Sequence, residues 1–229
     1  MLRAILCELE GVLVQTTALR RLSMARAVQS FGGSLPDDWR SELTEPPIVP
    51  ADAADALQAA GLDTDEPARD LLGIGASRFF LERVSAGGVS LADGATAFVR
   101  DAAAQVRLAI VTRARRREAE LLLSHTPFAD AFAFVIAEED VPRGKPHPDA
   151  YMAALDRLRL PPDVTRDALA MEHGALGIAS AVAAGVGCVA VGPFEQAPGV
   201  APVIAIASLA TVTVPLLARL LERDPQVVP

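Results

Sequence analysis

The hydrophobic and polar positions of residues 5–14 form the pattern around which the rest of the chain is organised. Residues 5–7 are apolar, two carboxylates follow at Glu8 and Glu10, and Gly11 comes next. An apolar run that ends at a turn residue is typical of a buried strand opening into a turn. Acidic residues at a strand end also fit a solvated boundary, so this stretch alone specifies no reaction.

Residues 16–89 are predicted to be helical. From Thr16 to Phe31, apolar side chains recur at helical spacing, and Gly32 and Gly33 end the pattern. Prolines interrupt the next segment, after which two further helical patterns cover residues 51–60 and 67–84. This block therefore forms a helical unit of its own.

From Leu91 onward, the pattern changes to strands that alternate with helices. Strands are predicted at 106–111, 132–137, 167–171 and 187–191, with an edge strand at 203–206. Helices are predicted at 92–105, 115–123, 148–158, 177–184 and 213–222, and residues 224–229 are expected to be frayed. Such alternation indicates a parallel sheet with right-handed crossovers. The predicted fold class is α/β, a doubly wound Rossmann-like parallel sheet formed by residues 1–15 and 90–229, with the helical block 16–89 inserted into it.

Composition narrows the function classes. The net charge of −8 provides no basic face for nucleic acid or an anionic membrane, so neither is expected as a partner. Hydrophobic residues make up 51% of the chain, but no apolar run reaches the length of a membrane span. Cys7 and Cys188 lie in apolar runs, where buried free thiols are expected, and the cytoplasm is the expected compartment.

Polar side chains gather at one edge of the predicted sheet. The carboxyl ends of parallel strands meet at the same edge, where α/β proteins bind ligands. The residues placed there are Glu8, Glu10, Thr112, Lys145, Glu172 and His173. Acids, a hydroxyl and a lysine beside helix N-termini together predict a phosphate site.

Each of these residues also has a plain structural interpretation. Thr112 is suited to be an N-cap, Lys145 to be a solvated loop lysine, and His173 to be a hydrogen-bonded polar residue. Arg113 and the arginines at 115–117 could hold phosphate or simply form a solvated face. The convergence of several strand ends favours the functional interpretation of the group as a whole.

Four ordered motifs carry a family resemblance. They lie at residues 6–14, 109–113, 140–151 and 170–185. On these motifs the chain resembles the haloacid dehalogenase superfamily, in its β-phosphoglucomutase-like and phosphoglycolate phosphatase-like branch with a helical cap. The resemblance implies a small phosphorylated metabolite as substrate and residues 16–89 as the cap domain.

The same resemblance implies roles for the site residues. Glu8 takes the place of the aspartate nucleophile and Glu10 that of the aspartate acid/base. Thr112 matches the residue that binds the phosphoryl group, and Lys145 the one that steadies its charge. Arg113, next to Thr112, is a further candidate for substrate binding.

A divalent metal, normally magnesium in this family, would by resemblance be held by Glu8, Glu10, Glu172 and His173. His173 stands where the family usually has an aspartate. Magnesium favours oxygen ligands, so an imidazole at this position should weaken magnesium binding. It could instead favour the binding of zinc, nickel or iron.

The replaced aspartates predict impaired activity. Glutamate is longer than aspartate by one methylene, which moves a carboxylate by about 1.5 Å, and a misplacement of about 1 Å can cost on the order of 100-fold in rate. Two hypotheses follow: a divergent phosphatase with weak or lost turnover, or a non-catalytic protein that binds a phosphometabolite or a protein partner. Arg40, Arg78 and Arg83 could contact substrate from the helical block or could be surface residues. The helical block lacks the Lys-Gly-x-Ser-Arg segment of the β-phosphoglucomutases that the chain resembles. This departure disfavours a sugar phosphomutase.

Overall fold

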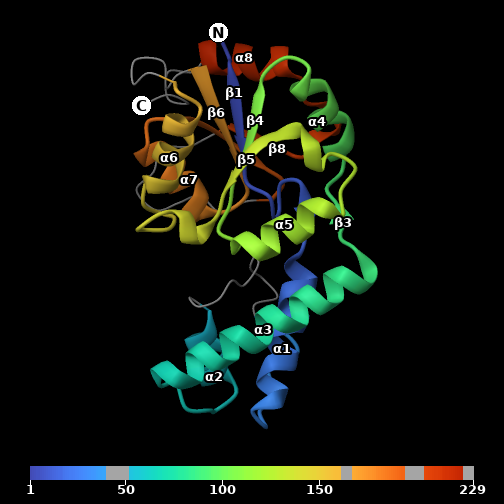
Figure 1. Ribbon diagram of the computed structural model, residues 1–229, viewed down its shortest axis with the longest axis vertical. Helices are drawn as coiled ribbons and strands as arrows, with labels where there is room; N and C mark the ends of the chain where they lie inside the picture. Colours follow the sequence, from blue (N-terminus) through green and yellow to red (C-terminus); the bar gives the residue numbers. More distant parts are fainter. Residues whose placement is uncertain (40–51, 161–166, 194–203, 224–229) are drawn as a thin grey trace. The chain divides into compact units, whose positions relative to one another are not determined.

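The computed structural model describes residues 1–39, 52–160, 167–193 and 204–223 (Figure 1). The chain divides into two compact units, residues 1–15 with 90–229 and residues 16–89. The expectations for Arg40 and for the tail at 224–229 lie outside the described residues. Within the described ranges, no helix has both the length and the apolar content that a membrane span requires.

A parallel sheet forms the centre of the first unit. Within the described residues it has six strands in the order β5-β4-β1-β6-β7-β8. The strands are β1 Ala4–Cys7, β4 Arg107–Val111, β5 Phe132–Ile136, β6 Ala168–Glu172, β7 Gly187–Val191 and β8 Ile204–Ile206. On β1, Leu6 pairs with Ala109 of β4 on one side and with Ala170 of β6 on the other. The α/β fold predicted from the alternation of strands and helices is confirmed.

Helices cover both faces of this sheet. They are α4 Ala95–Ala103, α5 Arg116–Ser124, α6 Asp149–Arg157, α7 Ala175–Ala183 and α8 Val214–Arg223. Helices α6 and α7 pack their buried side chains against alternate residues of β1, β4, β6 and β7, and Figure 1 shows α4 on the opposite side. Strands β4 and β5 lie on one side of β1, and strands β6, β7 and β8 lie on the other. The strand order therefore reverses at β1, and the carboxyl end of β1 is the topological switch point.

The core strands are buried on both faces, which explains their continuous apolar sequence. Every residue of β1 is 0% exposed, and β7 is buried along its whole length. Cys7 and Cys188 are free and buried in these strands, as predicted. Burial, with the nearby Glu172 charge, raises the pKa of both thiols, which keeps them protonated.

The second unit is helical over its described residues. Its helices are α1 Thr17–Ser30, α2 Ala53–Ala59 and α3 Glu66–Gly87. Met24, Ala27 and Val28 of α1 pack with Leu57 of α2 and Leu72 of α3 in one apolar cluster. The guanidinium of the buried Arg20 lies 3.7 Å from the centre of the Phe80 ring, which is a cation–π contact between α1 and α3.

Several boundaries differ from the sequence prediction for local reasons. Helix α4 begins at Ala95 rather than residue 92, because Gly94 has a φ of +78° and precedes the helix. Strand β6 extends through Glu172, which was predicted to follow the strand. An antiparallel pair of short strands, β2 Val14–Gln15 and β3 Ser90–Leu91, was not predicted.

Candidate active site

Three neighbouring strands place acidic and hydroxyl side chains at the switch point. Glu8 follows the last residue of β1, Thr112 follows β4, and Glu172 ends β6. The main chain keeps these positions in register, since Glu8 N–H donates to Met171 O at 2.9 Å and Thr112 N–H to Ile136 O at 2.9 Å. Glu8, Thr112 and Glu172 are all buried, so their interactions are made with the protein rather than with bulk water.

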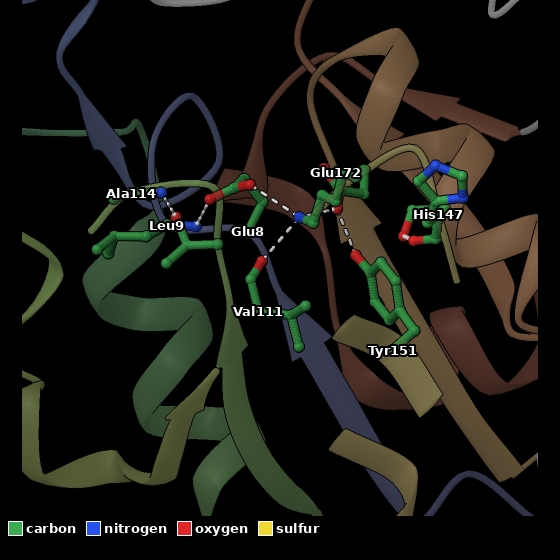
Figure 2. A network of polar contacts seen from close by, with 10 residues as sticks. Glu8, Leu9, Val111, Ala114, His147, Tyr151 and Glu172 are labelled. Atoms are coloured by element: carbon green, nitrogen blue, oxygen red, sulfur yellow. Dashed lines mark hydrogen bonds and ion pairs between the residues drawn. The ribbon is translucent and has the colours of Figure 1, made fainter. Parts of the chain in front are cut away.

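The Glu8 carboxylate is held by donors on both of its oxygens. Its Oε1 accepts from Leu9 N–H at 2.7 Å and its Oε2 accepts from Lys145 Nζ at 2.9 Å (Figure 2). The Thr112 side chain is a further hydrogen-bonding neighbour that lowers the pKa of this carboxyl. Burial alone would raise the pKa of this carboxyl. The Lys145 charge and these hydrogen bonds outweigh burial, so the pKa of Glu8 lies below its ordinary value.

Lys145 is the cation at the centre of the site. Its ammonium donates to Glu8 Oε2 at 2.9 Å, to Val111 O at 2.9 Å and to Glu172 Oε1 at 2.6 Å. Since an ammonium has three hydrogens, the protein takes all of them. The Lys145 side chain is only 1% exposed, so the interpretation of Lys145 as a solvated loop lysine is wrong. Burial would lower its pKa, but the charges of Glu172 and Glu8 raise it above its ordinary value.

Glu172 shares this lysine with Glu8. Its Oε1 accepts from Lys145 and from the Tyr151 hydroxyl of α6 (Figure 2). Burial and the Glu8 charge raise the pKa of Glu172 despite the nearby ammonium, because two carboxylates share one cation. A side chain at Gly177 would overlap the Glu172 carboxylate, so the start of α7 is shaped to this acid.

Thr112 lies before helix α5 rather than at its N-cap. The cap position of α5 is Arg115, and the helix begins at Arg116, so the N-cap interpretation of Thr112 is wrong. Instead, Thr112 Oγ1 accepts from Ala114 N–H at 3.1 Å, which leaves its own hydrogen for Glu8. Burial raises the pKa of Glu138, and the positive charge of Arg113 partly offsets this rise.

Glu10 and His173 lie beside the turn that follows β1. Glu10 is buried and bridges through its backbone to Val14. His173 Nδ1 is 3.1 Å from Val191 O, and because a carbonyl only accepts, Nδ1 carries the hydrogen. The imidazole packs against Gly11, where an added Cβ would lie only 2.5 Å from His173 Cγ.

The structure gathers no metal site from the acids of the described residues. Among the described residues, no three or more His, Cys, Asp or Glu side chains converge as a metal site requires. Glu8 and Glu172 each give a carboxylate oxygen to Lys145, and magnesium would need such oxygens in near-octahedral geometry. The predicted ligand set of Glu8, Glu10, Glu172 and His173 therefore stays a prediction.

Sequence reasoning missed several polar groups of the site. Tyr151 is the last residue of the third motif, and its role was not predicted, although it is the only tyrosine of the chain and a buried hydroxyl needs a partner. The Leu9 N–H and Val111 carbonyl belong to the main chain and leave no signal in residue type. Arg78 and Arg83 belong to the helical unit, where Arg78 pairs with Glu82 at 3.6 Å.

Comparison with known proteins decides the family. A model described as haloacid dehalogenase-like hydrolase matches residues 2–185. The chain belongs to the haloacid dehalogenase-like hydrolase family. This confirms the family that the four motifs resemble. Solved structures of the same fold include a β-phosphoglucomutase from Clostridium difficile, which has a TM-score of 0.79 and 15% identity and covers 97% of this chain and 98% of that one.

Two curated relatives are similar to this haloacid dehalogenase-like chain over different shares of its length. Protein CbbY of Rhodobacter capsulatus is 37% identical over 111 residues, which are 47% of this chain and only 48% of that protein. Validoxylamine A 7'-phosphate phosphatase of Streptomyces hygroscopicus subsp. limoneus is 27% identical over 202 residues, covering 88% of this chain and 91% of that enzyme. These relatives support a phosphatase lineage.

A solved structure is similar to this chain over nearly its whole length. CbbY from Rhodobacter sphaeroides in complex with phosphate has a TM-score of 0.77 and 25% identity to this chain. The match covers 92% of this chain and 96% of that one.

Proposed function

We propose that this chain derives from phosphatases of small phosphorylated metabolites and that its own turnover of phosphate esters is impaired or lost. In this proposal Glu8 stands at the nucleophile position and Glu10 at the acid/base position, and residues 16–89 act as the cap that selects the ligand. The names of the relatives support phosphate monoesters as the ligand class.

The observation that carries the proposal is the state of the Glu8 carboxylate. A nucleophile needs an oxygen directed at phosphorus, but both Glu8 oxygens accept hydrogen bonds from this chain. One of these bonds runs to the N–H of the next residue, so the longer side chain bends back on its own backbone. A displacement of about 1 Å in a reacting group can cost on the order of 100-fold in rate.

A non-catalytic binding protein is the second candidate. Lys145 and Thr112 are retained and buried, which suits ligand binding as well as catalysis. Lys145 donates hydrogen bonds to both Glu8 and Glu172. These bonds alone explain why the three side chains are ordered, without any catalytic role. Under this alternative, a phosphometabolite or a partner would act through occupancy alone.

Hydrolysis assays with the purified chain test the proposal. We expect wild type and Glu8→Gln to release para-nitrophenol from para-nitrophenyl phosphate at the same background rate, with magnesium, manganese, zinc or nickel added separately. A panel of sugar and small-acid phosphates should give the same result. Fast wild-type turnover that Glu8→Gln abolishes would show that glutamate serves as an efficient phosphate acceptor, and the proposal of impaired turnover would be wrong.

A further inference from the structure

We propose that Glu8 occupies an oxyanion-binding site of its own protein, so that an external phosphate can bind there only when this carboxylate is removed. The site, here called the oxyanion cradle, consists of the Leu9 N–H, the Thr112 hydroxyl and the Lys145 ammonium. This inference rests on the proposed function, because it gives the physical cause of impaired phosphate handling.

The donors of the oxyanion cradle come from three separate segments and meet on one carboxylate. Leu9 N–H reaches Glu8 Oε1 at 2.7 Å, Lys145 Nζ reaches Oε2 at 2.9 Å, and the Thr112 side chain adds a third hydrogen bond. A backbone N–H, a hydroxyl and an ammonium are the donors that proteins use to hold phosphate oxygens. Glu8 thus accepts the bonds that an incoming oxyanion would need.

None of these donors is left over for a second anion. The remaining hydrogens of Lys145 go to Val111 O and Glu172 Oε1, and Thr112 has a single hydroxyl hydrogen. A phosphate placed beside the ionised Glu8 would also meet its negative charge in a buried setting, where charges are screened little. Occupancy and repulsion therefore both keep phosphate out of the wild-type site.

The oxyanion cradle does not depend on Glu8 for its shape. Lys145 stays anchored by the Val111 carbonyl and by Glu172, which Tyr151 holds in turn. Thr112 is positioned by its backbone bond to Ile136 O and by the Ala114 N–H that fixes its oxygen. Shortening Glu8 should therefore leave buried, unsatisfied donors around an open space, which is a strong driving force for anion binding.

Titration calorimetry with inorganic phosphate, without added metal, tests the inference on the full chain. We expect Glu8→Ala to bind phosphate at least about tenfold more tightly than wild type, which corresponds to about 1.4 kcal/mol. Glu8→Gln is the matched control, because it removes the charge while keeping a side chain of the same length in place, and its gain in phosphate affinity should be much smaller than that of Glu8→Ala. Adding Thr112→Val to Glu8→Ala removes one donor and should reverse most of the gain.

Two results would overturn the inference. One is a Glu8→Ala protein that is folded by circular dichroism and still binds phosphate no better than wild type, and Glu8→Ser provides the same test if the alanine variant does not fold. The other is equal phosphate binding by Glu8→Gln and Glu8→Ala, which would assign the effect to charge alone. Ester turnover by wild type would refute impaired activity, whereas the phosphate titrations decide the oxyanion cradle independently.

Discussion

At the residue scale, Gly11 and the imidazole of His173 pack against each other beside the site. Gly11 has a φ of +82°, a left-handed conformation that favours glycine. Its missing side chain leaves room for the imidazole of His173, which is anchored at Val191 O. The histidine is therefore a packed and hydrogen-bonded residue, and Gly11 is required for reasons of both backbone and space.

Gly11→Ala should destabilise the protein by about 2–4 kcal/mol, as the sum of left-handed strain and overpacking. Urea unfolding measures this loss. In a His173→Ala background the steric part should disappear and the cost should fall to about 1–2 kcal/mol. Gly32→Ala is the control, because Gly32 has the same φ of +82° with nothing within 4 Å of an added Cβ. An equal cost of Gly11→Ala in both backgrounds would refute the contact with His173.

Sequence could indicate the site residues only as a group. Thr112, Lys145 and Glu172 were predicted to share one sheet edge. In the structure, Thr112 and Lys145 interact with Glu8, and Glu172 joins this group through Lys145. What the sequence could not show is which hydrogen goes to which oxygen, because Lys145 and Glu8 are 137 positions apart. Local patterns therefore favoured a solvated lysine and an N-cap threonine, and long-range burial decided otherwise.

At the element scale, strand and helix bounds follow local signals where those signals are strong. Strand β7 occupies its predicted range, since a short apolar run between glycine-containing turns is unambiguous. The pair β2 and β3 was missed because strands of two residues show no periodicity. Helix α3 begins before its predicted start, and the reason is a cap: the Asp65 side chain accepts from Ala68 N–H at 2.8 Å.

Asp65→Ala should therefore weaken the helical unit by about 1 kcal/mol, the usual cost of losing an N-cap. The loss can be followed by thermal and urea unfolding monitored at 222 nm. Asp70→Ala is the matched control, because Asp70 is exposed inside α3 and alanine favours a helix, so no loss is expected there. Equal destabilisation by both variants would mean that charge, rather than capping, stabilises the start of α3.

At the scale of the whole molecule, the fold of the family is retained. The solved CbbY structure superposes over 92% of this chain, and the switch point still gathers Thr112, Lys145 and Glu172. Glu8, Glu10 and His173 stand where the resemblance leads one to expect aspartates. Composition and pattern could predict the frame, whereas the proposed impairment of turnover rests on side-chain length and ligand type.

The central claim is that these replacements, and not a change of fold, impair phosphate ester turnover. The most direct measurement is magnesium-dependent hydrolysis of para-nitrophenyl phosphate by the Glu8→Asp, Glu10→Asp, His173→Asp triple variant beside wild type. Restoring the shorter carboxylates and an oxygen ligand should raise the rate by about 100-fold or more, and chelation of magnesium should abolish the gain. A triple variant that unfolds like wild type yet stays at the background rate would contradict the claim, as would wild type already matching the triple variant.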